Sequence, residues 1–143
     1  MNIEKKKINN VVASFALIVV LLLSTTVGVF AASYSSSFDG EWYTGNGGSV
    51  NGASNGAYHK LGKGTATINY HVNGATSTYP VYVQLKRAAT GIDINYGKVT
   101  ITNTRGSKNF PEKTDVVSSK YYIIASAGTH DTKHRIYGTL ETN

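Results

Sequence analysis

Hydrophobic and polar residues alternate along much of the chain after residue 60, which is the pattern of half-buried β-strands. In residues 65–72, the stretch TATINYHV, one face carries Ala66, Ile68, Tyr70 and Val72. In residues 78–87 the same alternation groups Tyr79, Val81, Val83 and Leu85. Pro80 has no N–H group, so it belongs at the start of this strand or on a sheet edge.

Further strands are predicted on both sides of these two. A first strand is expected around residues 37–43, and Asn73-Gly74 predicts a hairpin turn after residue 72. Residues 91–97 alternate with Ile92, Ile94 and Tyr96 on one face, and Gly97 turns the chain into 98–103, where Val99 and Ile101 point inward. The apolar run 120–126 suits a central strand, and 135–141 places Ile136 and Leu140 on one face. Residues 104–115 and 128–134 are interpreted as connections.

These stretches amount to about seven short strands separated by turn signals, with no helical periodicity after residue 32. Such spacing predicts an all-β fold, an antiparallel β-sandwich or a small barrel, and we favour the sandwich. No repeat of 20 to 50 residues is visible, which argues against a propeller or a solenoid.

The N-terminal residues 1–31 have the features of a signal peptide. Lys5, Lys6 and Lys7 precede an apolar run from Val11 to Ala32, and small residues favour cleavage after Ala31. The alternative is an uncleaved membrane anchor, because the run is about long enough to span a bilayer. We expect cleavage, which leaves residues 32–143 as a single domain without a transmembrane segment. That domain is expected to be secreted, extracellular or associated with the cell wall, and the lack of cysteine in an exported chain suggests a bacterial protein.

The chain is basic, with a formal net charge of +6 that falls to +4 when residues 1–31 are removed. This charge favours acidic partners, so a cell-wall polymer, a glycan or an anionic envelope surface is expected. No basic run is longer than the pair Lys86-Arg87. Nucleic acid is therefore not an expected partner, because its binding needs a dense basic stripe.

Two short patterns of enzymes and metal sites occur in the sequence, and neither is complete. Residues 52–56 match the G-x-S-x-G pattern around Ser54, but that elbow needs a following helix, which an all-β chain does not offer. His130, Asp131 and His134 are too few for a zinc site, and Lys133 between them repels a cation. Neither a phosphate-binding loop nor a pair of catalytic acids can be identified. We therefore predict no catalytic residues, no metal and no cofactor, and a protein that is not an enzyme.

Aromatic side chains offer the best candidates for ligand contact. On a strand, tyrosines one or three positions apart, such as Tyr121 and Tyr122 or Tyr79 and Tyr82, point to opposite faces and cannot all face the core. Exposed rings beside Asn, Gln and Thr suit the binding of sugars. A wet sheet face that simply tolerates tyrosine is the competing interpretation. The candidate ligand-binding residues lie in residues 40–59 and on two later strands: Trp42, Tyr43, Tyr58, His59, Tyr82 and Tyr137.

Two short segments resemble a known family. GEWYTG, with Gly40, Trp42 and Gly45, and the segment from Tyr58-His59 to Ala66-Thr67-Ile68 resemble the lactococcin nine-seven-two bacteriocins. The resemblance covers about 30 residues. It implies a small exported β-sandwich that interferes with cell-wall synthesis by binding the lipid-linked wall precursor. The chain departs from that family by its greater length and by Gly64-Thr65 before Ala66, where the family has a histidine.

The sequence thus predicts a secreted, non-enzymatic β-sandwich that acts through surface binding at the cell envelope or in the medium. The alternative is a secreted bacteriocin-like antibacterial protein that acts on the cell wall. A hydrolase that uses Ser54 is a third hypothesis.

Overall fold

The computed structural model describes residues 32–44, 48–128 and 132–143 of the chain, and in these residues all regular structure is β-strand. Two antiparallel sheets pack face to face, which confirms the predicted β-sandwich. No helix in the described part of the chain is long and apolar enough to cross a membrane.

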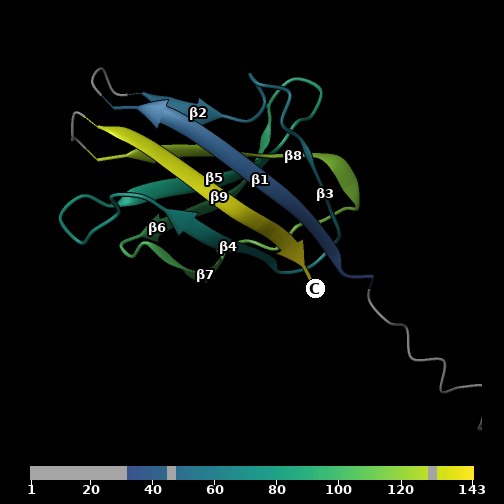
Figure 1. Ribbon diagram of the computed structural model, residues 1–143. Coiled ribbons are helices and arrows are strands. Elements are labelled where there is room, and N and C mark those ends of the chain that lie inside the picture. The colour runs from purple at the N-terminus through teal and green to yellow at the C-terminus, as the bar shows by residue number, and fades with distance from the viewer. Residues whose placement is uncertain (1–31, 45–47, 129–131) are drawn as a thin grey trace, which may run out of the picture. The chain divides into compact units, whose positions relative to one another are not determined.

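The first sheet has the strand order β1-β9-β4-β7, and its strands are β1 (Tyr34–Tyr43), β9 (Lys133–Thr142), β4 (Ala66–Val72) and β7 (Arg105–Asn109). The second sheet has the order β2-β8-β5-β6, and its strands are β2 (Ser49–Asn51), β8 (Ser118–Ala127), β5 (Val81–Arg87) and β6 (Ile94–Ile101). The short strand β3 (His59–Leu61) also pairs with β8. Figure 1 shows β1, β9 and β4 in front of the strands of the second sheet, with β2 beside the end of β1.

The predicted alternation supplies the core between the sheets. All four residues of the inward face of β4, the first three inward residues of β5, and Ile136 and Leu140 of β9 are buried. The apolar run at residues 120–126 becomes β8, which lies between β2 and β5 as a central strand should. Tyr121 and Tyr122 point to opposite sides of this strand, yet both are buried, because Tyr58 packs against Tyr122 from outside.

Several connections differ from the prediction. Asn73-Gly74 does not close a hairpin, because β4 pairs with β9 and β7 while β5 belongs to the other sheet. Gly97 does not turn the chain: β6 runs through it, with a left-handed φ of 94° and a shift in register against β5. The expected connection 104–115 contains the edge strand β7, whose residues are all exposed. Strands β2 and β3 are only three residues long and show no alternation to detect.

Three residues predicted to share a buried face are exposed instead. Ile92 is 88% exposed, and Ile94 and Tyr79 are each 37% exposed. Ile92 and Tyr79 precede the strand to which the alternation assigned them, and Ile94 is the first residue of β6. Residues at or beyond the end of a strand are covered less by the facing sheet.

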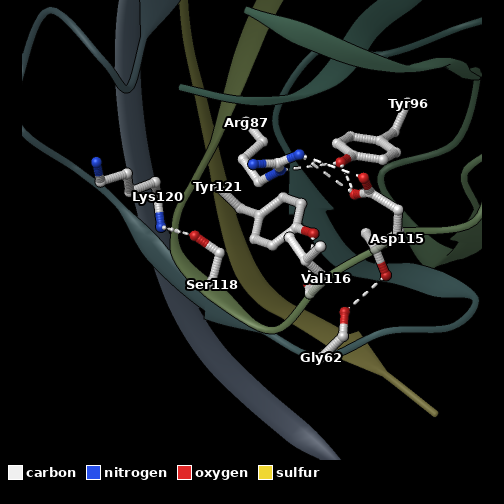
Figure 2. A network of polar contacts seen from close by, with 9 residues as sticks. Gly62, Arg87, Tyr96, Asp115, Val116, Ser118, Lys120 and Tyr121 are labelled. Atoms are coloured by element: carbon white, nitrogen blue, oxygen red, sulfur yellow. Dashed lines mark hydrogen bonds and ion pairs between the residues drawn. The ribbon is translucent and has the colours of Figure 1, made fainter. Parts of the chain in front are cut away.

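A polar network fixes the connection between β7 and β8 to the end of the second sheet (Figure 2). The guanidinium of Arg87 donates to the hydroxyl of Tyr96 at 3.0 Å and forms an ion pair with Asp115 at 3.3 Å. The Tyr96 hydroxyl donates a short hydrogen bond to the same carboxylate. The hydrogen bond from Tyr96, and then the charge of Arg87, lower the pKa of Asp115 below its usual value.

We expect Asp115→Asn to lower the urea midpoint of unfolding at neutral pH and to matter less in acid. Because the folded-state pKa is lowered, the carboxylate stabilises the fold above its unfolded pKa of about 3.9, and that stabilisation disappears as the pH falls through the lowered value. Urea titrations of the wild type and the variant, at neutral pH and at a pH near the lowered pKa of Asp115, measure the difference between their midpoints. This difference should be smaller at the acidic pH. Glu112→Gln, on the same connection, is the control for charge loss and should leave the neutral-pH midpoint unchanged. An equal difference in midpoint at both pH values would contradict the stabilising role of the ionised Asp115 carboxylate.

Candidate functional site

A groove lies between the two sheets at the edge where β1 of the first sheet faces β2 and β3 of the second. It consists of two hollows that share the side chains of Glu41, Val50 and Asn55. The first hollow has a volume of about 330 Å³, and the second, more open, has about 640 Å³. These volumes are in the range of sites for small ligands. We call the two hollows together the β1–β2 groove.

The floor of the β1–β2 groove is apolar, and its rim is polar. Phe38, Val50, Ile123 and Ile136 line the first hollow from the core side. Hydroxyl, amide and carboxylate groups surround both hollows, and they belong to Ser37, Asp39 and Glu41 on β1 and to Ser49, Asn51, Ser54 and Asn55 on β2 and the turn after it. Alternation along β1 produces this division, because Phe38 faces inward while Ser37 and Asp39 face outward.

The turn that follows β2 builds one wall of the groove and contains the G-x-S-x-G pattern. Its backbone is closed by hydrogen bonds from Ala57 N to Gly52 O at 2.8 Å and from Gly56 N to Ala53 O at 3.3 Å. The Asn51 side chain accepts from Ala53 N at 3.0 Å. The turn leads into β3 rather than a helix, so the setting of a nucleophile elbow is not formed there. Backbone and side-chain hydrogen bonds thus hold the turn, while residues 45–47 lie outside the described residues.

Two carboxylates on the β1 side of the groove are held by cations of β9. Arg135 forms a bidentate contact with Asp39, whose closest distance is 2.6 Å, and Lys133 approaches Glu41 at 2.6 Å. The hydrogen bond from Arg135 lowers the pKa of Asp39, so this carboxylate is ionised at neutral pH. Each carboxylate oxygen has a second lone pair, which can accept a hydrogen bond from a ligand.

His59 lies at the inner end of the first hollow and is buried. Its Nδ1 is 3.0 Å from the hydroxyl of Ser36, and its ring meets that of Phe38 edge-on. Burial lowers the pKa of His59, which keeps the imidazole neutral at neutral pH. Within the described part of the chain no carboxylate contacts this ring, so the Ser36–His59 pair has no third member that would make it a triad.

Trp42 lines the second hollow, although most of its indole is buried. The indole stacks on the ring of His134 with centroids 5.4 Å apart. Its Nε1–H group is buried and has no hydrogen-bond partner among the described residues, which costs stability.

Three of the six predicted ligand-binding residues line the groove, and three do not. Trp42, Tyr43 and His59 line one or other hollow. Tyr137 lies on the outer face of the first sheet, stacked on His71 with centroids 5.1 Å apart. On the second sheet, Tyr82 lies under Lys98, and Tyr58 covers Tyr122. The six residues therefore do not form one aromatic surface.

Sequence reasoning missed the polar rim of the groove. Asn51, Asn55, Asp39 and Glu41 are common residues of strands and turns, and nothing in their spacing marks them as neighbours. Only the approach of β1 and β2 from different sheets brings them together. The one available signal was the position of Trp42 and of the Asn- and Ser-rich stretch within the same twenty residues.

No group of three or more potential metal ligands occurs among the described residues. His134, one member of the candidate cluster, is buried, and both of its ring nitrogens have partners: Thr132 Oγ1 at 3.1 Å and the carbonyl of Asn73 at 3.3 Å. His130 and Asp131 lie outside the described residues.

Comparison with known proteins identifies neither a matching family model nor a matching curated relative. The resemblance to the lactococcin nine-seven-two bacteriocins therefore stays a prediction.

Several solved structures are similar to this chain. A mutant of a family 29 carbohydrate-binding module has a TM-score of 0.42 at 10% identity, over 78% of this chain and 74% of its own. The C-terminal family 22 carbohydrate-binding module of Clostridium thermocellum Xyn10B has 0.36 at 9% identity, over 81% and 88%. A chain of turnip yellow mosaic virus has a TM-score of 0.31 at 11% identity, over 79% of this chain and 94% of its own. At these TM-scores and identities the solved structures assign no function to this chain.

Proposed function

We propose that this protein is an exported, non-catalytic binding domain that holds a neutral oligosaccharide in the β1–β2 groove. The observation that carries the proposal is the composition of that groove: an apolar floor and a rim that offers both donors and acceptors. A sugar ring has an apolar C–H face and hydroxyl groups that donate and accept. It can therefore pack on such a floor while its hydroxyls reach the rim.

The rim supplies both kinds of partner. Asp39 and Glu41 accept from hydroxyl groups, and the amide of Asn55 donates to hydroxyl oxygens. The Asn55 side chain is exposed and makes no hydrogen bond within the described residues, so it is available to a ligand. Hydrogen bonds to ionised carboxylates are stronger than neutral ones, which favours Asp39 as an orienting group.

The lining of the groove also argues against acidic ligands. Asp39 and Glu41 are already paired with Arg135 and Lys133, and among the described residues no lysine or arginine lines either hollow. An anionic polymer would find no cationic partner there. We therefore assign the neutral glycans of the expected partner set to the groove.

We expect the domain to bind neutral oligosaccharides and Asn55→Ala to weaken that binding by about two- to tenfold, because one hydrogen bond contributes about 0.5–1.5 kcal/mol net. Ala57→Trp, which fills the first hollow from an exposed position, should weaken it further. A glycan array selects the ligand, and calorimetric titration measures the affinities.

Asn103→Ala is the matched control, since Asn103 is an exposed asparagine on the turn between β6 and β7, away from the groove lining. Its affinity should equal that of the wild type. Two results would contradict the proposal: equal binding by all variants, or no neutral glycan bound at all. If the wild type cleaves the ligand and a folded Ser54→Ala variant does not, the protein is a hydrolase and the proposal of a non-catalytic domain is wrong.

A further inference from the structure

One end of the sandwich combines exposed aliphatic side chains with lysines. At this end Arg87, the last residue of β5, pairs with Asp115, and the backbone of Ala88 donates to the carbonyl of Lys120. Gly64 is hydrogen-bonded to Thr114, which adds the connection after β3. We call this region, formed by residues 60–65, 86–94 and 111–120, the lysine end.

Four exposed aliphatic side chains belong to the lysine end. Ile92 is 88% exposed and Val117 is 55% exposed, and Ile94 and Val116 are exposed beside them in the chain. Ile94 pairs with Arg87, whose guanidinium holds the residue before Val116, so the two aliphatic segments meet at this network. Exposed aliphatic residues that gather in one region mark a surface that contacts something other than water.

The valines are held in position and do not lie on a free loop. The hydroxyl of Tyr121 donates to the carbonyl of Val116 at 2.7 Å, as Figure 2 shows. On one side of the pair Asp115 is bound by Arg87 and Tyr96, and on the other the hydroxyl of Ser118 accepts from Lys120 N at 3.1 Å. The chain therefore presents Val116-Val117 to solvent on a fixed backbone.

Positive charge surrounds these aliphatic residues. The lysines of this end, none of which forms an ion pair within the described residues, are Lys60, Lys63, Lys86, Lys113 and Lys120. Of the three acidic residues there, Asp115 is paired with Arg87, whereas Asp93, which accepts from Tyr122 and Ala89, stays ionised. Asp93 and Glu112 are thus two carboxylates without an ion pair in the described residues, against five lysines. The free charge of the lysine end is therefore predominantly positive.

The start of the first strand also belongs to the lysine end. β1 starts at Tyr34, whose ring is 5.3 Å from the ammonium of Lys60, and it pairs there with Thr142 of β9. Exposed aliphatic side chains among lysines match a partner that offers phosphates above an apolar layer, which is the chemistry of an anionic bilayer.

We propose that the lysine end docks on an anionic phospholipid bilayer. Ile92 and Val117 enter the boundary between headgroups and acyl chains, while the lysines contact lipid phosphates. The β1–β2 groove extends along β1 to Trp42 and Tyr43, at the far end of that strand. Docking therefore leaves the second hollow open toward the medium, and it does not depend on what the groove binds.

The test uses the domain of residues 32–143, which contains the whole described core. We expect it to sediment with vesicles of phosphatidylglycerol and phosphatidylcholine, to be released by salt, and to ignore pure phosphatidylcholine. Lys113→Gln with Lys120→Gln should weaken binding by about tenfold or more, given the usual contribution of each basic residue near an anionic surface. Ile92→Ser with Val117→Ser should weaken it by a similar factor, because the apolar area buried in the bilayer is lost.

Matched controls remove the same groups elsewhere. Lys98→Gln with Arg105→Gln removes two charges outside the lysine end, and Tyr137→Ser removes an exposed ring from the first sheet. Both should bind vesicles almost as the wild type does. The proposal is overturned if the wild type ignores anionic vesicles or if all variants bind equally. Self-association in sedimentation velocity that Ile92→Ser with Val117→Ser abolishes, without vesicle binding, would overturn it in favour of a second copy.

Discussion

Gly138→Ala is expected to destabilise the domain by about 3 kcal/mol or more, a large part of the 5–15 kcal/mol typical of a domain. Gly138 lies in β9 with Phe38 of β1 on one side and Tyr70 of β4 on the other. Its φ is 154°, and a Cβ atom there would lie 1.9 Å from the backbone oxygen of Asn69. That oxygen belongs to a paired strand, so the contact can be relieved only by opening the ladder between β4 and β9.

Gly91→Ala is the matched control for this substitution. Gly91 also has a positive φ, 92°, but a Cβ added there meets nothing within 4 Å. It should therefore lose only the backbone preference of glycine, about 1–2 kcal/mol. Urea unfolding of both variants, followed by tryptophan fluorescence, gives the two free energies. Equal losses would mean that the crowding at Gly138 does not matter.

Ile101→Ala is the second substitution expected to have a large effect, a loss of about 2–5 kcal/mol. Ile101 is fully buried at the end of β6, where it pairs with Val81. Truncation removes its apolar contacts and leaves a cavity that the two packed sheets cannot fill completely.

Ile92→Ala deletes the same atoms from a side chain that is 88% exposed, two residues before the same strand. Its free energy of unfolding should stay within about 0.5 kcal/mol of the wild type. If the two variants lose comparable stability, the burial assigned to Ile101 is wrong. The same Ile92 variant should weaken vesicle binding, which separates its role at the lysine end from any role in folding.

The strands that carry the core were predictable because alternation reports burial directly. Ile68, Val83 and Leu140 occupy inward positions of their strands and alternate with residues that face outward. Each is fully buried. Burial of one face per strand follows from the two-residue period of the backbone, whatever the strand pairs with. For the same reason the prediction stopped being useful at β2 and β3, which are too short to show a period.

Pairing partners were not predictable, because alternation does not say which strand lies beside which. The dipeptide Asn73-Gly74 suggested a hairpin, yet β4 pairs with β9, more than sixty residues later, and the chain crosses to the other sheet after residue 74. Hydrogen bonds and apolar burial are similar for many pairings of such strands. The choice among them depends on how all the strands pack together.

The candidate site, too, was predicted only in part from the sequence. By itself the sequence determined an all-β chain with its inward residues, and it drew attention to Trp42, Tyr43 and His59 in the stretch that forms one side of the groove. The tertiary structure alone decided that Asp39 and Glu41 on β1 would face Asn55 after β2, and that Tyr137, Tyr82 and Tyr58 would lie on other surfaces. The physical reason is that burial is a local property of each strand, whereas a groove exists only where strands of the two sheets come together at an edge of the sandwich.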